Sequence, residues 1–303
     1  MARRVAKIRP RRKGSAAPGG DGRVPPLQTA EIERSLAFIR MNDRGGKPRS
    51  RGITEIRGPY YTPMGTRYLQ DVLETMGAYV DALKFAGGSF SLMPRKAVRD
   101  LIDLAHAHNV LVSTGGFIEY VLTQGREAVR RYIEECKGLG FDIIELSTGF
   151  ITIPTDDWLR LVEQVAKAGM KPKPEVGIQY GAGGASAAAD LAAEGVRDPD
   201  YAIAQARRLL EAGAYMIMVE SEGITENVQS WRTDIVTKFV DGLGLERVMF
   251  EAADPDVFSW YIKNYGVEVN LFVDHSQIVQ LECLRSGIWG TKSLWGRVLT
   301  YKG

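Results

Sequence analysis

The stretch YVDALKFAGGS, residues Tyr79–Ser89, decides how this chain is expected to fold. It begins as an apolar run that favours a β-strand, and the run delivers Lys84 to its end, just before two glycines. A strand that ends in lysine and breaks into glycines provides a rigid support for one cation beside a loop that can turn tightly. Pro94 then precedes an amphipathic helix over residues 96–105. The sequence therefore predicts a unit of strand, glycine loop and helix.

This unit recurs eight times along the chain. Most of its strands are continuous apolar runs rather than alternating ones, as expected for strands that helices cover on both faces. Eight such units favour the α/β class and a closed (β/α)8 TIM barrel. A doubly wound open sheet is the competing fold, but the first strand lacks the glycine fingerprint that binds a dinucleotide phosphate. The predicted strands cover residues 52–57, 79–84, 109–114, 142–147, 171–177, 214–220, 247–252 and 267–273.

The composition divides the chain into three parts. Residues 1–28 form a basic tail with many Arg, Lys, Gly and Pro residues, which is typical of a disordered segment. We interpret this tail as a solvated arm, with a weak contact to an acidic partner as the alternative. Residues 29–50 predict a short helix, over 30–40, followed by a polar linker. Residues 51–303 are expected to form the barrel as a single domain.

The overall composition is that of an ordinary soluble protein. Of the 303 residues 45% are hydrophobic and 25% are charged, and the net charge of +2 gives no reason to expect a nucleic-acid partner. We expect no membrane partner, because no apolar run is long enough to span a bilayer. The two cysteines, Cys136 and Cys283, have no CxxC spacing, so we expect a reducing, cytoplasmic location and no structural zinc. The sequence leaves the formation of a homo-oligomer open.

Polar residues stand at the predicted C-terminal ends of the strands, where the active site of a barrel lies. Five strands deliver a carboxylate there, and one delivers Lys84. Carboxylates that converge on one opening repel one another unless a cation or a proton neutralises them, and all-oxygen ligands suit Mg²⁺. The alternative is that these acids pair with side chains such as Lys173. The candidates are Glu55, Arg57, Lys84, Ser113, Thr114, Glu145, Ser147, Glu175, Glu220, Glu222, Glu251, Asn270 and His275.

Two further segments bear on this opening. His275 and Ser276 begin the helix after the eighth strand, where barrels often bind phosphate at free backbone N–H groups. A plain N-cap role for Ser276 is equally open. The glycine-rich segment 180–186 lacks the Gly-Lys-Ser/Thr ending of a nucleotide-binding loop, and we interpret it as a mobile lid.

Several segments together resemble the phosphosulfolactate synthase family, from Arg51 to about Gly290. The resemblance is closer still to a branch of that family named for plant heat-stress-associated proteins. The segments similar to the synthases are 84–88, 115–119, 139–145, 175–177, 250–252, 269–271 and 281–285. Those similar to the branch are 54–59, 91–94, 134–137 and 273–278. The resemblance implies a Mg²⁺-dependent (β/α)8 barrel that adds sulfite to phosphoenolpyruvate on a coenzyme M-type route.

The same resemblance implies roles for individual residues. Lys84 and Glu145 are expected to be catalytic, and Lys84 protonates C2 of the substrate with a pKa that burial or neighbouring cations lower. Mg²⁺ is expected to contact Glu145, Glu175 and Glu251, directly or through the residues around its ligands. The expected substrate-binding residues are Arg57, Ser113, Asn270, His275 and Ser276.

Three segments depart from the synthases. The first strand ends in Arg57-Gly58, where synthases have Asp-Lys or Asp-Asn, and residues 221–224 read SEGI in place of Arg-Glu-Ser-Gly. The lysine loop, residues 86–88, reads AGG in place of Gly-Trp-Gly. Because these changes rebuild the anion pockets, two alternatives stay open. One is a non-enzymatic heat-stress-tolerance protein on the same barrel, and the other is an enzyme for another phosphorylated hydroxy acid.

Overall fold

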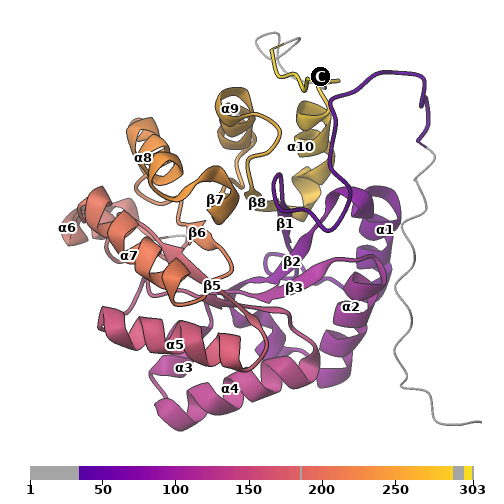
Figure 1. Ribbon diagram of the computed structural model, residues 1–303. Coiled ribbons are helices and arrows are strands. Elements are labelled where there is room, and N and C mark those ends of the chain that lie inside the picture. Colours follow the sequence, from indigo (N-terminus) through magenta and orange to yellow (C-terminus); the bar gives the residue numbers. More distant parts are fainter. Residues whose placement is uncertain (1–33, 185, 289–296, 302–303) are drawn as a thin grey trace, which may run out of the picture.

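The computed structural model describes residues 34–184, 186–288 and 297–301. The predicted tail, residues 1–28, therefore lies outside the described residues. In the described part of the chain, eight parallel strands close into one barrel in sequence order, from β1 to β8 and back to β1 (Figure 1). The prediction of a (β/α)8 TIM barrel is confirmed. The strands are β1 (Thr54–Arg57), β2 (Ala82–Phe85), β3 (Leu111–Thr114), β4 (Ile143–Leu146), β5 (Lys171–Val176), β6 (Ile217–Val219), β7 (Val248–Glu251) and β8 (Leu271–Asp274).

Helices surround the barrel and bury their apolar faces against it (Figure 1). The spacing of the apolar residues explains this, since α2 turns Val98, Leu101 and Ile102 to one side, where all three are buried. No helix among the described residues combines the length and apolarity that crossing a membrane requires. The helices are α1 (Thr66–Met76), α2 (Arg95–Ala107), α3 (Ile118–Leu122), α4 (Arg126–Leu139), α5 (Thr155–Lys167), α6 (Ala188–Glu194), α7 (Pro199–Glu211), α8 (Thr233–Leu243), α9 (Pro255–Tyr265) and α10 (Ile278–Arg285).

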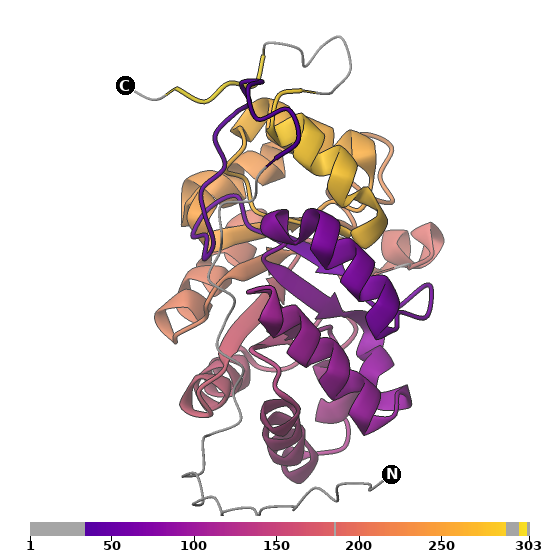
Figure 2. The ribbon, with the colours of Figure 1, turned by 90° about the vertical axis from the view of Figure 1, so that its right-hand side faces the viewer.

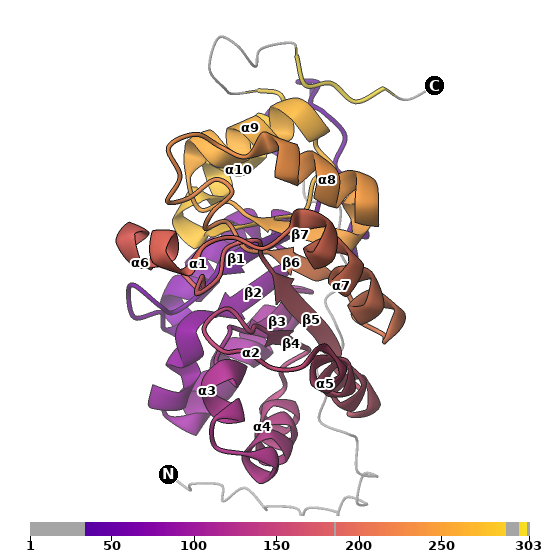
Figure 3. The same ribbon diagram turned by 90° about the vertical axis from the view of Figure 1, so that its left-hand side faces the viewer.

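Short 3₁₀ segments and an extra helix lie between the main elements. The glycine loop after Lys84 forms the 3₁₀ segment η2 (Ala86–Leu92), in which Gly87 and Gly88 have φ of 59° and 70°, a conformation that favours glycine. Three further 3₁₀ segments are η1 (Gly77–Tyr79), η3 (Leu245–Arg247) and η4 (His275–Gln277). In the connection between β5 and α7, α6 stands out from the ring of helices (Figure 3).

The interior of the barrel contains an apolar cluster and a set of buried charged side chains. The small apolar cluster is separate from the large core between strands and helices. One of its members, Phe272, is the register partner of Glu55. Four charged side chains in this interior are almost fully buried: Glu55, Lys84, Glu145 and Lys173. The apolar cluster comprises Ile53, Met216, Met218, Met249 and Phe272.

The segment before β1 packs against the barrel at the N-terminal ends of the strands, beside the C-terminal part of the chain (Figure 2). Arg44 pairs with Glu282 at 3.0 Å, and Arg49 pairs with Asp81 at 2.9 Å. The ammonium group of Lys47 donates to three backbone carbonyl oxygens. The expected helix over 30–40 is wrong where it is described, because residues 35–38 form a turn. The expected linker is likewise part of the barrel's packing.

Candidate active site

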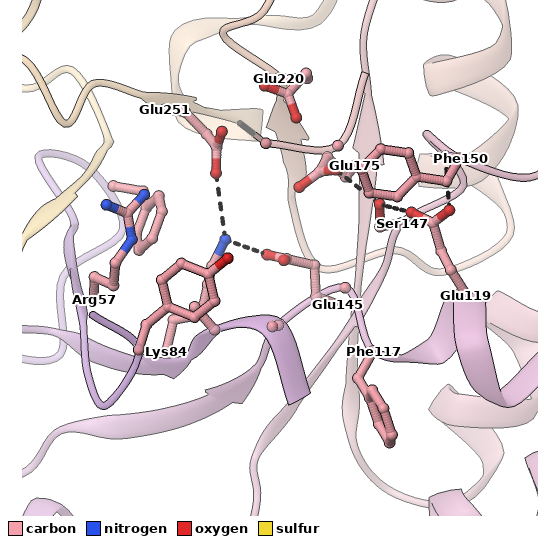
Figure 4. Close-up of a pocket in the computed structure, with 18 of the residues that line it drawn as sticks. Arg57, Lys84, Phe117, Glu119, Glu145, Ser147, Phe150, Glu175, Glu220 and Glu251 are labelled. Carbon is pink, nitrogen blue, oxygen red and sulfur yellow. Dashed lines mark hydrogen bonds and ion pairs between the residues drawn. The ribbon is translucent and has the colours of Figure 1, made fainter. Parts of the chain in front are cut away.

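A pocket of about 390 Å³ opens at the C-terminal ends of the strands (Figure 4). Two basic residues, Arg57 and Lys84, belong to its described lining. Carboxylates outnumber them, because six glutamates from several strands and loops also line it. Such a concentration of acids is costly unless protons or cations neutralise some of them. The six are Glu119, Glu145, Glu175, Glu220, Glu226 and Glu251.

Lys84 extends from β2 into this pocket and is only 3% exposed. Its Nζ lies 2.7 Å from Oε2 of Glu145 and 3.7 Å from Oε1 of Glu251, and both ion pairs are drawn in Figure 4. The Nζ also lies 3.8 Å from the centre of the Phe272 ring. Burial alone would lower the pKa of Lys84, but the surrounding carboxylates, first Glu145, raise it above its ordinary value. The expected lowering of this pKa is therefore wrong.

Glu145 extends from β4 and lies between two lysines. The Nζ of Lys173, on β5, is 3.2 Å from the Glu145 oxygen that Lys84 also contacts. Burial would raise the pKa of Glu145, but the two ammonium groups lower it below its ordinary value. Lys173 pairs in addition with Glu55 on β1. Sequence reasoning considered Lys173 only as an alternative partner for the acids, and the structure makes it a member of a buried charge network.

Three other carboxyl groups of the pocket hold their protons more tightly than usual. Burial first, and then the charges of Glu145 and Glu251, raise the pKa of Glu175 to about 8. Burial and the nearby carboxylates raise the pKa of Glu220 well above its ordinary value. Burial also raises the pKa of Glu251, although Lys84 opposes this effect. The raised pKa values show that the basic side chains nearby do not fully neutralise these three carboxyl groups.

The shortage of positive charge bears on the expected Mg²⁺. A divalent cation would supply positive charge beside Glu175, Glu220 and Glu251, and carboxylate oxygens are the ligands that Mg²⁺ prefers. Within residues 34–184, 186–288 and 297–301, however, no three His, Cys, Asp or Glu side chains already converge as metal ligands. Glu145 is the least suited of the expected ligands, because one of its oxygens already pairs with two lysines. By its donor chemistry, though not by a preformed geometry, the set Glu175, Glu220 and Glu251 thus fits Mg²⁺.

Arg57, at the end of β1, lines the pocket as expected. Its guanidinium group lies 3.9 Å from a carboxylate oxygen of Asp274. The same group lies 5.1 Å from the ring centres of both Tyr61 and Phe272, so aromatic faces hold it on two sides. Arg57 is thus a cation at the pocket that an anionic group of a ligand can reach.

Two glutamates hold the loops around the mouth. Glu119, in α3, accepts hydrogen bonds from the hydroxyl of Ser147 and from the backbone N–H groups of Gly149 and Phe150 (Figure 4). Sequence reasoning missed this role, although Glu119 belongs to a segment similar to the synthases and follows Gly115-Gly116. The other residue, Glu222, is fully buried.

Glu222 binds the glycine-rich segment that was interpreted as a lid. Its carboxylate accepts hydrogen bonds from the backbone N–H groups of Gly183, Gly184 and Ser186, and from the Ser186 hydroxyl. Gly183 and Gly184 also line the pocket. The segment therefore lies at the mouth, as predicted, and a buried carboxylate anchors it there.

The structure contradicts the expectation that Asn270 lies at the mouth. Asn270 precedes β8, at the opposite end of the barrel from Lys84, because the strand begins at Leu271 rather than at residue 267. Its side chain accepts from the N–H of Ile53 and donates to the carbonyl oxygens of Leu245 and Val248. These bonds satisfy the buried amide with backbone groups. Asn270 thus joins chain segments and does not meet a ligand in the pocket.

Three other expected substrate-binding residues do not line the pocket either. Ser113, on β3, is buried and donates to the carbonyl oxygen of Thr114. The Nδ1 of His275 lies 2.9 Å from the carbonyl oxygen of Arg57. The expected N-cap role of Ser276 falls to Asp274, whose carboxylate accepts from the Ser276 N–H and hydroxyl. An acid at this position disfavours the phosphate site that we expected there.

Comparisons with known proteins show the family to which this chain belongs. Residues 42–291 match the model of the (2R)-phospho-3-sulfolactate synthase (ComA) family. The chain is 42% identical over 266 residues to "Protein HEAT-STRESS-ASSOCIATED 32" of Arabidopsis thaliana, a match that covers 84% of this chain and 93% of the relative. It is 28% identical over 254 residues to the phosphosulfolactate synthase of Methanothermobacter thermautotrophicus, covering 82% and 93%.

Solved structures show a likeness of fold alone. The carboxyl transferase domain of Rhizobium etli pyruvate carboxylase is similar to this chain with a TM-score of 0.51 and 14% sequence identity. The match covers 75% of this chain and 40% of that one, so the chain spans less than half of the solved protein. At such identity nothing is inferred from it about chemistry.

Proposed function

Since this chain belongs to the (2R)-phospho-3-sulfolactate synthase (ComA) family, we propose that it adds sulfite to phosphoenolpyruvate to give (2R)-phospho-3-sulfolactate, with the help of Mg²⁺. The observation that carries this proposal is the position of Lys84. It is a buried ammonium group on a rigid strand, held by Glu145 and directed into the pocket among further carboxylates. A proton donor in such a position is what the addition requires.

The bonds of the proposed reaction balance without a further reactant. The sulfur lone pair of sulfite forms a bond to C3 of phosphoenolpyruvate while the π bond between C2 and C3 breaks and their single bond remains. Negative charge then resides on C2 and the adjoining carboxylate until Lys84 gives its proton to C2. The neutral amine recovers a proton from water. Arg57, the second cation of the pocket lining, would bind the phosphate or sulfonate group.

The acidic pocket needs a counter-charge for such an anionic substrate. Glu175, Glu220 and Glu251 would hold Mg²⁺, for the reasons given above. When bound, the ion would hold the substrate carboxylate and stabilise the negative charge that develops on it. Pairing of Glu251 with a cation other than Lys84 would also lower the pKa of this lysine, which makes it a better acid.

The direct test is incubation of the purified protein with phosphoenolpyruvate, sulfite and Mg²⁺, followed by mass spectrometry. We expect a product whose mass equals the sum of phosphoenolpyruvate and sulfite plus the protons gained. Omission of sulfite, and addition of EDTA, should each abolish that product. If no product forms with sulfite, other nucleophiles and other enol phosphates should be offered, because the family assignment does not fix the substrate. Absence of product from phosphoenolpyruvate and sulfite would overturn the proposed reaction, and absence of turnover on any enol phosphate would overturn an enzymatic role on this class of substrate.

A second candidate function is protection against heat stress without catalysis. The observation that favours it is the 42% identity to a relative that is named for heat stress. The test is heat survival of cells whose own copy of the gene is deleted and which carry either the wild type or Lys84→Met. Equal survival with both would support a non-catalytic role. Loss of protection with a stably folded Lys84→Met would support catalysis.

A further inference from the structure

Four aromatic side chains surround the mouth of the pocket, and we call them the aromatic collar. Tyr60 and Tyr61 follow β1, Tyr120 lies in α3 after β3, and Phe150 follows β4. All four line the same pocket as Lys84. They come from three separate connections between strands and helices, so the barrel itself brings them together. Neither the strand pattern nor the family resemblance pointed to this arrangement.

The four rings of the collar leave much of their apolar surface exposed to solvent. Tyr61, Tyr120 and Phe150 are 69%, 62% and 61% exposed, and Tyr60 is 49% exposed. Single exposed aromatic residues are ordinary, but several around one opening mark a binding site. Each ring offers a large flat surface whose burial against a ligand is favourable. The collar thus gives the entrance of the pocket a surface that suits an apolar ligand group.

The rings are held in place before any ligand arrives. Tyr60 lies against Gly87, where a Cβ atom would come within 2.4 Å of the Tyr60 ring. Phe150 lies in the same way against Gly183, where a Cβ atom would come within 2.3 Å of its ring. Phe117 stacks on the ring of Tyr120 at 5.7 Å between centroids. A site arranged in advance spends little free energy on ordering when a ligand binds.

Phosphoenolpyruvate and sulfite have little apolar surface to place in such a collar. The pocket volume of 390 Å³ falls within the roughly 300–1,000 Å³ of sites that enclose drug-sized ligands. Arg57 and Lys84 also line this pocket and provide two cationic groups that can bind the acid head of a ligand. The remaining space at the collar therefore suits a second, apolar part of the same ligand.

The charge around the collar selects between a neutral and a cationic occupant. The guanidinium group of Arg57 already lies over the ring of Tyr61, 5.1 Å from its centre. A cationic ligand group that approached the face of the Tyr61 ring would be repelled by this guanidinium group. A neutral planar group meets no such opposition and can stack on the exposed rings.

We propose that the aromatic collar binds a neutral, aryl-sized group carried by a ligand whose small acid head reaches Arg57 and Lys84. The ligand class is thus a two- or three-carbon acid, of the kind that the proposed reaction uses, bearing an apolar substituent, and phosphoenolpyruvate itself would leave the collar unfilled. This inference rests on the proposed function only for the acid head, because the collar is observed independently of any reaction.

The test compares two acids that share a head and differ in the aryl group. Calorimetry with pyruvate and with phenylpyruvate, on the full chain with Mg²⁺, should show tighter binding of phenylpyruvate by about tenfold or more, equivalent to about 1.4 kcal/mol. Tyr61→Ala and Tyr120→Ala should each remove much of that preference, because both rings are exposed and neither supports the core. The matched control is Tyr201→Ala, an exposed tyrosine on α7 that does not line the pocket, which should leave the preference unchanged.

Four outcomes would overturn the inference. Three are equal affinity for the two acids, a preference that survives Tyr61→Ala and Tyr120→Ala, and an equal loss with Tyr201→Ala. The fourth is tighter binding of glycine betaine, a trimethylammonium acid, than of phenylpyruvate, which would exclude a neutral occupant. The measurement needs no turnover. Binding of phenylpyruvate by a protein that fails to convert phosphoenolpyruvate would therefore refute the proposed function and leave the collar inference standing.

Discussion

Lys84 and Lys173 share one carboxylate oxygen, Oε2 of Glu145, at 2.7 and 3.2 Å. The two lysines differ in what else they reach. Lys84 lines the pocket, whereas Lys173 does not and pairs instead with the buried Glu55. The same anion thus has one cation directed into the pocket and one directed into the barrel. Under the proposed function, this division assigns catalysis to Lys84 and stability to Lys173.

Replacement of Lys84 by methionine should remove catalysis and leave the fold intact. Met keeps most of the side-chain length, and Lys173 still neutralises Glu145. Loss of a positioned general acid typically lowers turnover by roughly 10²–10⁴-fold. Turnover and melting temperature should be measured on the same preparation. A stable Lys84→Met protein with undiminished turnover would remove this lysine from the mechanism.

The matched control is Lys173→Met, which should act in the opposite sense. It leaves Glu55 without its ammonium partner in the interior of the barrel, where Glu55 is fully buried. Breaking a buried ion pair on one side costs about 3–5 kcal/mol. We therefore expect a markedly lower denaturation midpoint in urea than that of Lys84→Met. Equal stability of the two variants would show that the shared oxygen does not divide the roles of the lysines.

The raised pKa of Glu175 predicts that replacement of this residue by glutamine increases the stability of the folded protein in a pH-dependent way. The ordinary pKa of this group is 4.5, and burial and the neighbouring carboxylates raise it to about 8 in the fold. Between these values the folded protein holds a proton that the unfolded chain releases, so the contribution of Glu175 to stability falls as pH rises through this window. Without metal, Glu175→Gln should therefore gain stability relative to the wild type from pH 5 to pH 8.

The expected relative gain is about 1–3 kcal/mol, smaller than the full shift would give because this side chain is partly exposed. Urea denaturation of both proteins at several pH values, in EDTA, provides the measurement. An exposed glutamate such as Glu163, replaced in the same way, serves as the control and should show no such trend. A difference in stability that stays constant with pH would contradict the assignment.

Binding of Mg²⁺ should release protons. At pH 7 the pKa of about 8 leaves Glu175 largely protonated, and burial also raises the pKa of Glu220, so an ion can bind these carboxylates only after any bound protons leave. Calorimetric heats should therefore differ between buffers of different ionisation enthalpy, and Mg²⁺ affinity should rise from pH 6 to pH 9. Identical heats in Tris and phosphate-free PIPES would argue that these groups are not the ligands. Glu175→Gln should release fewer protons than the wild type.

Two truncations should separate the basic tail from the segment that packs on the barrel. Deletion of residues 1–28 should change the melting temperature by less than about 5 °C, because such a composition cannot bury enough apolar surface. Deletion of residues 1–50 removes Arg44, Lys47 and Arg49, and so strands their buried partners. We expect that protein to melt much lower or to fail to fold. The variant Arg44→Met loses only the ion pair with Glu282, and its melting temperature should lie between those of the two truncated proteins.

The sequence predicted the barrel well because its evidence is repeated. Eight apolar runs, each followed by a turn and a helical pattern, indicated eight units, and the structure has eight strands in that order. The boundaries were less certain, and one of them mattered. The run from residue 267 to 273 gives no sign that pairing starts only at Leu271, so Asn270 was assigned to the wrong end.

The sequence predicted those site residues whose positions are set by the end of a strand. It did not predict contacts across the barrel or residues in the connections between strands and helices. Lys84, Glu145, Glu175 and Glu251 end their strands at one mouth, as expected. The use of Glu145 by two lysines depends on distances across the barrel that no spacing along the chain encodes. The aromatic collar was missed for a related reason, because its rings come from three connections between strands and helices that are distant in sequence.

The buried charge network also constrains how the chain reaches its native state. Lys173 and Glu55 lie 118 positions apart in sequence, on strands that are not neighbours in the barrel. A half-formed sheet that contains only β1 to β4 has Glu55, Lys84 and Glu145 but lacks the second lysine. Such an intermediate carries an excess of negative charge, so water must stay in its interior until β5 arrives. Drying of the interior is therefore coupled to the docking of β5 rather than to local strand formation, and the folding barrier should lie late, where such long-range contacts are made.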